Sequence, residues 1–350
     1  MPHKHLLSSM DAQFEQERKK IFELFHLYRD ESGIATDEYL MSLFRFQYKY
    51  NHIYRTYCEN LRINVQDVKK TSEIPYLPIS AFKSGMVTTG QFEAMEVFKS
   101  SGTTMQVRSL HFLRDLDHYL SQARYLWEQY FGYVDNYCFL GLLPGYLERD
   151  GSSLISMVNY FIQCSKYRQS GFYLRNHTEL FEKILECQHQ SIPTVLFGVS
   201  YALLDFFEQF SLNFPTLIIM ETGGMKGQRQ EMLKEELHSF LQEKSKSVSI
   251  CSEYGMTELM SQAYSKSSTK FIPNKCLKID TFQLSDPLTR EKMNKTGIIC
   301  VTDFANIDSC AFIQTEDVGI LYEDQSFEIA GRTAISDIRG CNLMMEELGL

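Results

Sequence analysis

Three short loops rich in small and hydroxylated residues carry the side chains best suited to chemistry. The first reads Lys-Ser-Ser-Gly-Thr-Thr over residues 99–104, with Arg108 four residues further on. The second contains Gly223 and Gly224, and the third reads Tyr-Gly-Met-Thr-Glu over residues 254–258. Small residues let the backbone approach a phosphate, while hydroxyl, N–H and guanidinium groups donate to its oxygens. A Tyr ring could stack on a base, and a Thr and a Glu could hold a phosphate and Mg²⁺. The loops are therefore candidates for a nucleotide site.

Each loop also has a purely structural explanation. A Ser/Thr-rich segment caps helices well, paired glycines form tight strand-to-helix turns, and Glu258 would stabilise the N-terminus of a helix. The first loop lacks the Walker pattern, G-x-x-x-x-G-K followed by Ser or Thr. Taken one at a time, the loops do not distinguish a nucleotide site from ordinary turns. The functional interpretation depends on their order and on where the fold places them.

The surrounding segments predict an α/β protein. Short apolar runs at residues 194–200, 216–220 and 248–251 alternate with loops and amphipathic helices, which is typical of parallel strands. Ligands of open α/β sheets bind beyond the carboxyl ends of the strands, and all three loops are expected there. An amphipathic helix is predicted after the first loop, and the residues on its apolar face are Leu116, Tyr119, Leu120, Ala123, Leu126, Trp127 and Tyr130. His111 and His118 lie seven residues apart, on the same helical side, and are expected to have surface or packing roles.

The chain divides into three predicted regions. Residues 1–74 are expected to form an N-terminal helical layer, because apolar and aromatic residues recur there at helical spacing. Residues 75–270 are predicted to be the α/β core that binds nucleotide and substrate. Helical patterns stop after residue 270, so residues 271–350 are expected to be a β-rich subdomain with a short tail.

Composition excludes several classes of function. The 350 residues include 44 acidic and 35 basic side chains, a net charge of −9, which argues against a nucleic-acid partner. The nine cysteines contain no C-x-x-C pair, which argues against a disulfide framework or a structural metal site and favours the cytoplasm. The sequence shows neither a signal peptide nor an apolar stretch long enough to span a membrane.

Four motifs in a fixed order resemble the core motifs of the adenylate-forming enzymes. They are Ser-Ser-Gly-Thr-Thr (100–104), Tyr-Gly-Met-Thr-Glu (254–258), Thr-Glu-Asp-Val-Gly (315–319) and Gly-Arg (331–332). Within this superfamily the chain looks most like the LuxE-type acyl-protein synthetases, the long-chain-fatty-acid ligases of bacterial luminescence. That likeness rests on Pro-Ile-Ser-Ala-Phe-Lys (78–83), Leu-Leu-Pro-Gly-Tyr-Leu-Glu-Arg (142–149), Gly-Gly-Met-Lys-Gly (223–227) and Arg-Gly-Cys (339–341). The resemblance implies a large N-terminal domain with a parallel-sheet α/β core and a small β-rich subdomain.

The resemblance also implies a role for each matching residue, with ATP and Mg²⁺ as cofactors and a fatty acid as substrate. A carboxylate would attack the α-phosphate of ATP and release pyrophosphate, with oriented donors and fixed positive charge supplying most of the catalysis. Thr257 would contact the α-phosphate, and Glu258 would bind Mg²⁺. The other nucleotide-binding positions are Ser100, Ser101, Gly102, Thr103, Thr104 and Arg108 at the phosphates, Gly223, Gly224, Tyr254 and Gly255 at the adenine, and Asp317 and Arg332 at the ribose or phosphate.

The first loop departs from the superfamily at two positions. Met105 stands where many members have glycine, and Arg108 stands where many have lysine. Arginine keeps the positive charge but presents a planar fork rather than a point charge. Phosphate binding is therefore expected with a different detailed geometry.

A cysteine near the C-terminus bears on the second half of the reaction. Eighteen residues follow Arg332, fewer than the roughly 50 that a domain needs, so the usual mobile C-terminal domain and its catalytic lysine are expected to be absent. Cys341 lies two residues after Arg339, which would favour the reactive thiolate. The resemblance implies that Cys341 takes the acyl group as a thioester and passes it to an acyl reductase or carrier protein. A small buried core residue is the structural alternative for Cys341.

Two other functions compete with an acyl-protein synthetase. A small aryl- or acyl-CoA ligase, similar to the phenylacetate type, would release AMP in the presence of CoA without needing Cys341. A non-catalytic relative would bind nucleotide or acyl chain without turnover, and the presence of Glu258, Asp317 and Arg332 counts against it.

Overall fold

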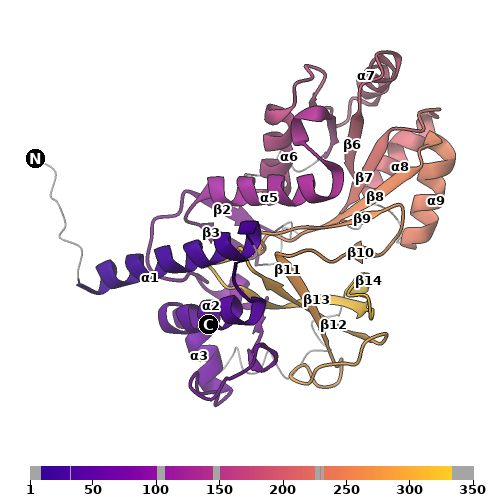
Figure 1. Cartoon of the computed structure of the whole chain (residues 1–350). Coiled ribbons are helices and arrows are strands. Elements are labelled where there is room, and N and C mark those ends of the chain that lie inside the picture. Colours follow the sequence, from indigo (N-terminus) through magenta and orange to yellow (C-terminus); the bar gives the residue numbers. More distant parts are fainter. Residues whose placement is uncertain are drawn as a thin grey trace, which may run out of the picture.

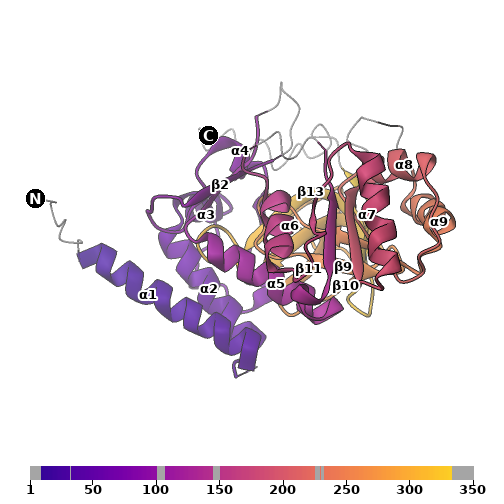
Figure 2. The ribbon, with the colours of Figure 1, turned by 90° about the horizontal axis from the view of Figure 1, so that it is seen from above.

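The computed structural model describes residues 9–31, 33–100, 107–144, 150–224, 229 and 232–332. Its N-terminal part is helical. The elements are α1 (Ser9–His26), a π-helical turn (Leu27–Glu31), α2 (Thr36–Tyr50), α3 (His52–Asn60), a 3₁₀ turn (Thr71–Glu73) and the short α4 (Ala81–Ser84). Figure 1 shows α1, α2 and α3 gathered on one side of the molecule, and Figure 2 shows the same arrangement from above.

In the described part of the chain, twelve strands form one mixed sheet. Five of them run parallel, in the spatial order β8, β7, β6, β4, β5. Their bounds are β4 (Cys138–Leu142), β5 (Gly171–Phe172), β6 (Thr194–Val199), β7 (Ile218–Thr222) and β8 (Ser249–Tyr254). Both β4 and β6 are buried along their whole length, as expected for parallel strands that are covered on both faces. The predicted α/β core is therefore confirmed.

Antiparallel strands continue the same sheet beyond β8. Their spatial order is β9, β10, β14, β13, β12, β11, and the two-residue β1 (Leu77–Pro78) pairs with β13 in parallel. Their bounds are β9 (Ala263–Lys266), β10 (Phe271–Ile272), β11 (Leu277–Phe282), β12 (Thr296–Asp303), β13 (Phe312–Leu321) and β14 (Phe327–Arg332). Strands and turns, without a helix, make up the described residues from 271 to 332.

Helices cover both faces of the parallel strands. Figures 1 and 2 show α5 and α6 on one side of β6, β7 and β8, and α8 and α9 on the other. The bounds of these helices are α5 (Leu116–Phe131), α6 (Ser153–Cys164), α8 (Ser200–Gln209) and α9 (Lys234–Ser245). A further helix, α7 (His177–His189), precedes β6. None of the helices in the described ranges is long and apolar enough to cross a membrane.

The N-terminal helices are joined to the sheet by buried hydrogen bonds. Asn51 ends α2 and caps α3, because its side-chain oxygen accepts the backbone N–H of Tyr54 at 3.0 Å. The Asn51 amide also donates to the carbonyl of Ser309 at 3.1 Å. One helical turn earlier, the Gln47 amide donates to the carbonyl of Asn306 at 2.7 Å. These bonds hold the segment between β12 and β13 in place.

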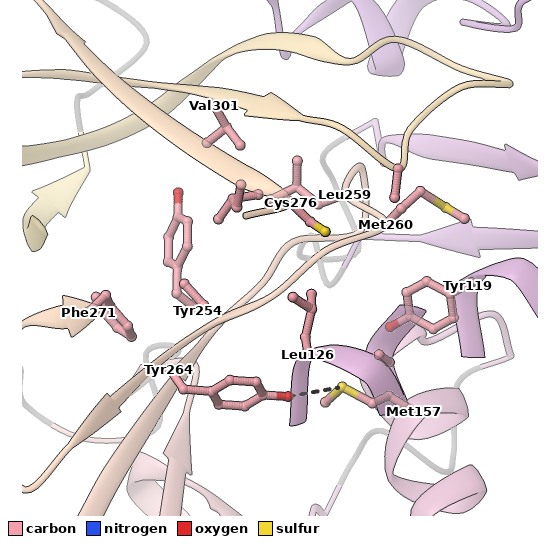
Figure 3. Packing of buried hydrophobic residues seen from close by; sticks show 14 of the residues in the cluster. Tyr119, Leu126, Met157, Tyr254, Leu259, Met260, Tyr264, Phe271, Cys276 and Val301 are labelled. Carbon is pink, nitrogen blue, oxygen red and sulfur yellow. Dashed lines mark hydrogen bonds between the residues drawn. The ribbon is translucent and has the colours of Figure 1, made fainter. Parts of the chain in front are cut away.

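Aromatic side chains fill the core between α5, α6 and the sheet. Trp127 is fully buried, and its ring stacks on Phe131 with centroids 4.4 Å apart. On β9, Tyr264 is buried and donates a weak hydrogen bond to the sulfur of Met157 on α6, at 4.0 Å (Figure 3). Much of the aromatic content of the sequence thus serves packing.

The helix predicted after the first loop is present as α5, but a separate antiparallel hairpin lies between the loop and this helix. Strands β2 (Glu96–Lys99) and β3 (Leu110–Leu113) form this two-stranded sheet, and the first loop connects them. The loop therefore does not follow a strand of the large sheet, and His111 and His118 do not share a helix. The hairpin and the place of His111 were missed because the four residues of β3 are too few to show a period, whereas the helical pattern that begins at Leu116 is strong.

A bulge sets the register between β13 and β14. The pairing shifts between Val318 and Gly319, so that Asp317 lies directly opposite Arg332. A Cβ atom at Gly319 would overlap the carbonyl oxygen of Glu328 on the partner strand, so this close approach of two backbones requires glycine.

Candidate active site

Two of the three loops lie side by side at the carboxyl edge of the parallel strands. Val199 on β6 pairs with Thr222 on β7, and Thr222 pairs with Glu253 on β8. The residues that follow these strands are therefore neighbours. Gly223 has a φ of 72°, a conformation that favours glycine, and a Cβ atom at Gly224 would meet nothing within 4 Å. Among the described residues, then, there is room beside Gly224 at the edge where ligands of such sheets bind.

A buried glutamate supports this edge from below. The Glu221 carboxylate accepts hydrogen bonds from the hydroxyls of Ser200 at 2.6 Å and Ser252 at 2.9 Å. The Lys234 ammonium lies 3.6 Å from the same carboxylate. These contacts join β7, β8, α8 and α9 directly beneath the glycine pair, so Glu221 fixes the position of the loop that follows it.

The Asp317 carboxylate is held by two side chains from different strands. Tyr254 on β8 donates its phenolic hydrogen to Oδ2 at 3.0 Å, and Nε of Arg332 on β14 donates to Oδ1 at 3.0 Å. The Asp317 side chain is only 6% exposed, whereas that of Arg332 is 73% exposed. The carboxylate is thus held rigidly beneath an open guanidinium. Since a carboxylate offers about four acceptor positions, it keeps capacity for the hydroxyls of a ligand.

The Asp317 carboxylate and burial determine the ionisation of Tyr254 and Arg332. The neighbouring Asp317 raises the pKa of the Arg332 guanidinium. Burial raises the pKa of the Tyr254 phenol well above its usual value, and the negative charge of Asp317 adds to this shift. Tyr254 therefore stays a neutral donor at physiological pH, and Arg332 stays a cation.

The ring of Tyr254 lies among two other aromatic side chains. Its centroid is 5.5 Å from that of Phe271 and 5.4 Å from that of Phe327. Figure 3 shows Tyr254 and Tyr264 on opposite sides of the strands that carry them. In the described structure, then, Tyr254 holds Asp317 and packs on phenylalanines, and its stacking on a base stays a prediction.

Glu258 is a buried carboxylate at the end of the third loop. Burial raises the pKa of its side chain, while a hydrogen bond from Ser109 and the charges of Arg332 and Lys83 oppose this shift. Lys83 is itself paired with Glu316, at 2.8 Å. Burial thus disfavours the ionised form of Glu258, whereas Ser109 and the nearby positive charges favour it.

The β2–β3 hairpin meets the third loop at its base. The amide of Ser109 donates to Oγ of Ser100 at 2.9 Å, and the amide of Ser100 donates to the carbonyl of Ser109 at 3.1 Å. The side chain of Ser109 then bonds with Glu258. The first loop is thus closed at its base and joined to the third, although the main sheet does not contain its strands.

Some predicted site residues are not placed by the structure. Ser101, Gly102, Thr103, Thr104 and Cys341 lie outside the described residues. Arg108 is half-buried at the end of the first loop. The described residues bring together Ser100 with Glu258, and Tyr254 with Asp317 and Arg332; the roles assigned to them stay predictions.

The donor set fits Mg²⁺ bound together with a nucleotide. In the described ranges no three His, Cys, Asp or Glu side chains gather into a metal site. Proteins usually bind Mg²⁺ through one or two carboxylates plus the phosphates of the substrate. Glu258 supplies one such carboxylate, so it would hold the ion only when phosphates complete the coordination.

Sequence reasoning missed three residues that build this site. Ser109 contacts Glu258, His111 contacts Thr257, and Asn306 donates to the carbonyl of Glu258 at 2.8 Å. Each of them contacts the backbone of the third loop or lies far from it in the sequence, so no motif within the loop identifies it. The one available signal was the position of Ser109 and His111 shortly after the first loop.

Solved structures with a similar fold include a CoA ligase and a CoA synthetase. An ATP-bound chimera of the MatB protein matches with a TM-score of 0.52 and 16% identity, over 67% of this chain and 47% of the other. An open conformation of 2-hydroxyisobutyryl-CoA ligase, in complex with its acyl-AMP and CoA, matches with a TM-score of 0.64 and 9% identity, over 85% of this chain and 69% of the other. O-succinylbenzoate-CoA synthetase (MenE) from Bacillus subtilis, with ATP and magnesium, matches with a TM-score of 0.50 and 17% identity, over 67% and 49%.

These matches show a shared fold. The chain has the fold of adenylate-forming ligases, and it spans about half the length of the MatB chimera and MenE. No protein-family model matches the sequence, and no curated protein matches it.

Proposed function

We propose that this protein is an ATP-dependent ligase that activates a carboxylic acid as acyl-AMP. An oxygen of the acid attacks the α-phosphorus of ATP, the bond to the bridging oxygen breaks, and pyrophosphate leaves. The observation that carries this proposal is the Tyr254–Asp317–Arg332 contact next to the Gly223 and Glu258 loops. These groups lie near one another at the carboxyl edge of the parallel strands, which supports a nucleotide site there.

The side chains at this edge would divide the work as follows. Asp317 accepts hydrogen bonds from the ribose hydroxyls, held in place by Tyr254 and Arg332. The Thr257 hydroxyl donates to the α-phosphate, and the exposed Arg332 guanidinium adds positive charge as negative charge builds up. Glu258 holds Mg²⁺, which would neutralise phosphate charge that otherwise repels the attacking carboxylate.

For the second half-reaction we propose that Cys341 accepts the acyl group. Its thiolate attacks the acyl carbon, the bond from carbon to the AMP oxygen breaks, and AMP leaves as a thioester forms. The substrate is then a fatty acid, and an acyl reductase or carrier protein would take the acyl group from the thioester. This step is supported by the likeness of residues 339–341 to the acyl-protein synthetases.

An isotope-exchange assay tests the first half-reaction. The purified chain is incubated with ATP, Mg²⁺, labelled pyrophosphate and a series of carboxylic acids that includes fatty acids of several lengths. We expect label to enter ATP only when a suitable acid is present. Glu258→Gln should lower the exchange rate by roughly 100-fold or more, because the site loses the charge that holds the metal. Exchange that does not depend on the acid would contradict the proposal.

A CoA ligase is the second candidate, because the solved structures with this fold include a CoA ligase and a CoA synthetase. It would form the same acyl-AMP but pass the acyl group to the thiol of CoA. Release of AMP that requires CoA and is unaffected by Cys341→Ala would favour this candidate. Binding of ATP without exchange for any acid would instead indicate a non-catalytic relative.

A further inference from the structure

We propose that His111 is a positioning residue, which fixes the backbone of the third loop through its Nδ1–H. Nδ1 of His111 lies 2.8 Å from the carbonyl oxygen of Thr257. Since a carbonyl oxygen only accepts, the imidazole must carry its hydrogen on Nδ1. This inference rests on the proposed function, in which Thr257 and Glu258 contact the nucleotide and its metal ion.

The surroundings of His111 leave its ring little freedom. The side chain is 1% exposed, and Phe82 packs against it edge to face with ring centroids 6.0 Å apart. Burial lowers the pKa of His111 to about 4, so the ring is neutral and has a single N–H to donate. That hydrogen is committed to Thr257, and a buried bond of this kind defines where the carbonyl sits.

A second contact fixes the next residue of the same loop. The Asn306 amide donates to the carbonyl of Glu258 at 2.8 Å, and the Asn306 side chain also bonds with His111. Two consecutive carbonyls are therefore held by one pair of linked side chains. Because both bonds act on the backbone, they set the direction of the Thr257 and Glu258 side chains without touching a ligand themselves.

The position of His111 on β3 gives this contact a wider role. His111 pairs with Phe98 on β2, and β2 leads into the first loop. The hairpin that carries the phosphate-binding candidates therefore contacts the third loop through a rigid ring. His111 thus helps to hold the third loop against the described part of the hairpin.

Two variants distinguish positioning from packing. The amide nitrogen of an asparagine lies close to where Nδ1 of histidine lies, whereas the longer glutamine places its amide near Nε2. His111→Asn should keep the exchange rate within about threefold of the wild type. His111→Gln should lower the same rate by roughly tenfold. Titration calorimetry should show that His111→Asn binds MgATP more tightly than His111→Gln. The melting temperatures of the two variants should differ little.

The outcomes separate this inference from the proposed function. Equal activity and equal MgATP affinity of His111→Asn and His111→Gln would overturn the positioning role, whether both are active or both impaired. If the wild type binds MgATP but exchanges with no acid, the proposed reaction fails while the difference in affinity still decides the role of His111. A wild-type chain that neither exchanges nor binds MgATP would overturn both.

Discussion

Tyr254 donates a 3.0 Å hydrogen bond to Asp317 although three strands separate β8 from β13 in the sheet. Neighbouring strands lie about 4.8 Å apart, so a flat sheet would hold these side chains roughly 19 Å from each other. The bond therefore requires a sheet that curls until its antiparallel part faces the end of β8. This curl brings the Asp317 carboxylate beside the Tyr-Gly-Met-Thr-Glu loop.

Removing the Tyr254 hydroxyl should weaken ATP binding. In Tyr254→Phe, Asp317 keeps Arg332 but loses the donor that fixes its second oxygen. A hydrogen bond to a charged group contributes about 1.5–3 kcal/mol, so we expect the KM for ATP to rise by roughly tenfold or more. The exchange assay at varied ATP concentration measures this change.

Tyr264→Phe is the matched control for that variant. Tyr264 is also buried, but its hydroxyl contacts only the sulfur of Met157 among the hydrogen bonds found in the described ranges. Its loss should leave the KM for ATP unchanged. The same KM for ATP in both variants would show that the Tyr254–Asp317 bond does not serve the nucleotide.

Replacing Cys341 should separate the two half-reactions. We expect Cys341→Ala to keep acid-dependent exchange but to lose covalent labelling by radioactive fatty acid, because only the thiolate forms the thioester. Gel electrophoresis without reducing thiols, followed by autoradiography, measures the labelling. Cys164 is the one partly exposed cysteine among those described, so Cys164→Ala is the control and should label normally. Labelling that survives in Cys341→Ala would refute the carrier role.

Asp303 gives the stability of the protein a specific pH dependence. Burial raises the pKa of its carboxyl to about 6 from a usual 3.8, although hydrogen bonds from Ser261 and from the amides of Met260 and Ala305 oppose the shift. Between these two pH values the folded state binds more protons than the unfolded state. The free energy of unfolding therefore falls as pH rises through this window, by on the order of 3 kcal/mol, and is unaffected by this group above it.

Urea unfolding of the wild type and of Asp303→Asn tests this dependence. The asparagine variant lacks the titrating group, so the wild type should lose stability relative to it between about pH 4 and pH 6. Above that window the difference between the two proteins should be constant. Parallel curves from pH 4 to pH 7 would show that burial does not perturb Asp303.

Two glycines with similar φ angles should respond differently to replacement by alanine. Gly132 and Gly151 have φ values of 86° and 79°. A Cβ atom at Gly132 would meet nothing within 4 Å, whereas one at Gly151 would overlap the carbonyl oxygen of Val97 on β2. Gly132 also has a ψ of −173°, a region almost confined to glycine, so Gly132→Ala should cost about 1–3 kcal/mol from backbone strain alone. Gly151→Ala should cost clearly more, because it adds the overlap with Val97.

Thermal and urea unfolding compare these two variants. Gly151→Ala should also slow the exchange reaction, because Gly151 accepts the amide of Lys99 at 2.7 Å directly before the first loop. Gly132→Ala should leave the reaction unchanged. If Gly132→Ala and Gly151→Ala lost the same amount of stability, the backbone of β2 at Val97 would have to move at little cost in free energy.

The sequence was sufficient for those parts of the site that depend on local pattern. The runs that became β6, β7 and β8 alternate with helices, so the meeting of Gly223 and Tyr254 at one edge was predictable. Asp317 and Arg332 lie 15 residues apart on adjacent antiparallel strands, and their motifs were recognisable.

Long-range pairing was not predictable in this way. The pairing of β10 with β9 and with β14 places the strands after residue 270 in the same sheet as the parallel strands. The spacing of apolar residues within each strand does not show which strands pair. The β2–β3 hairpin was also missed, and with it the contacts of Ser109 and His111. Both failures concern short strands whose partners are decided by tertiary packing.

The bulge in β14 makes the site more sensitive to a change in the length of this strand than to a change in its residue types. Side chains alternate along a strand, so one residue inserted into or deleted from β14 would turn Arg332 to the opposite face, while Asp317 stayed in place. Many substitutions in the connecting turn leave the register untouched. Over evolutionary time, this hairpin should therefore accept new residue types far more readily than single-residue insertions or deletions.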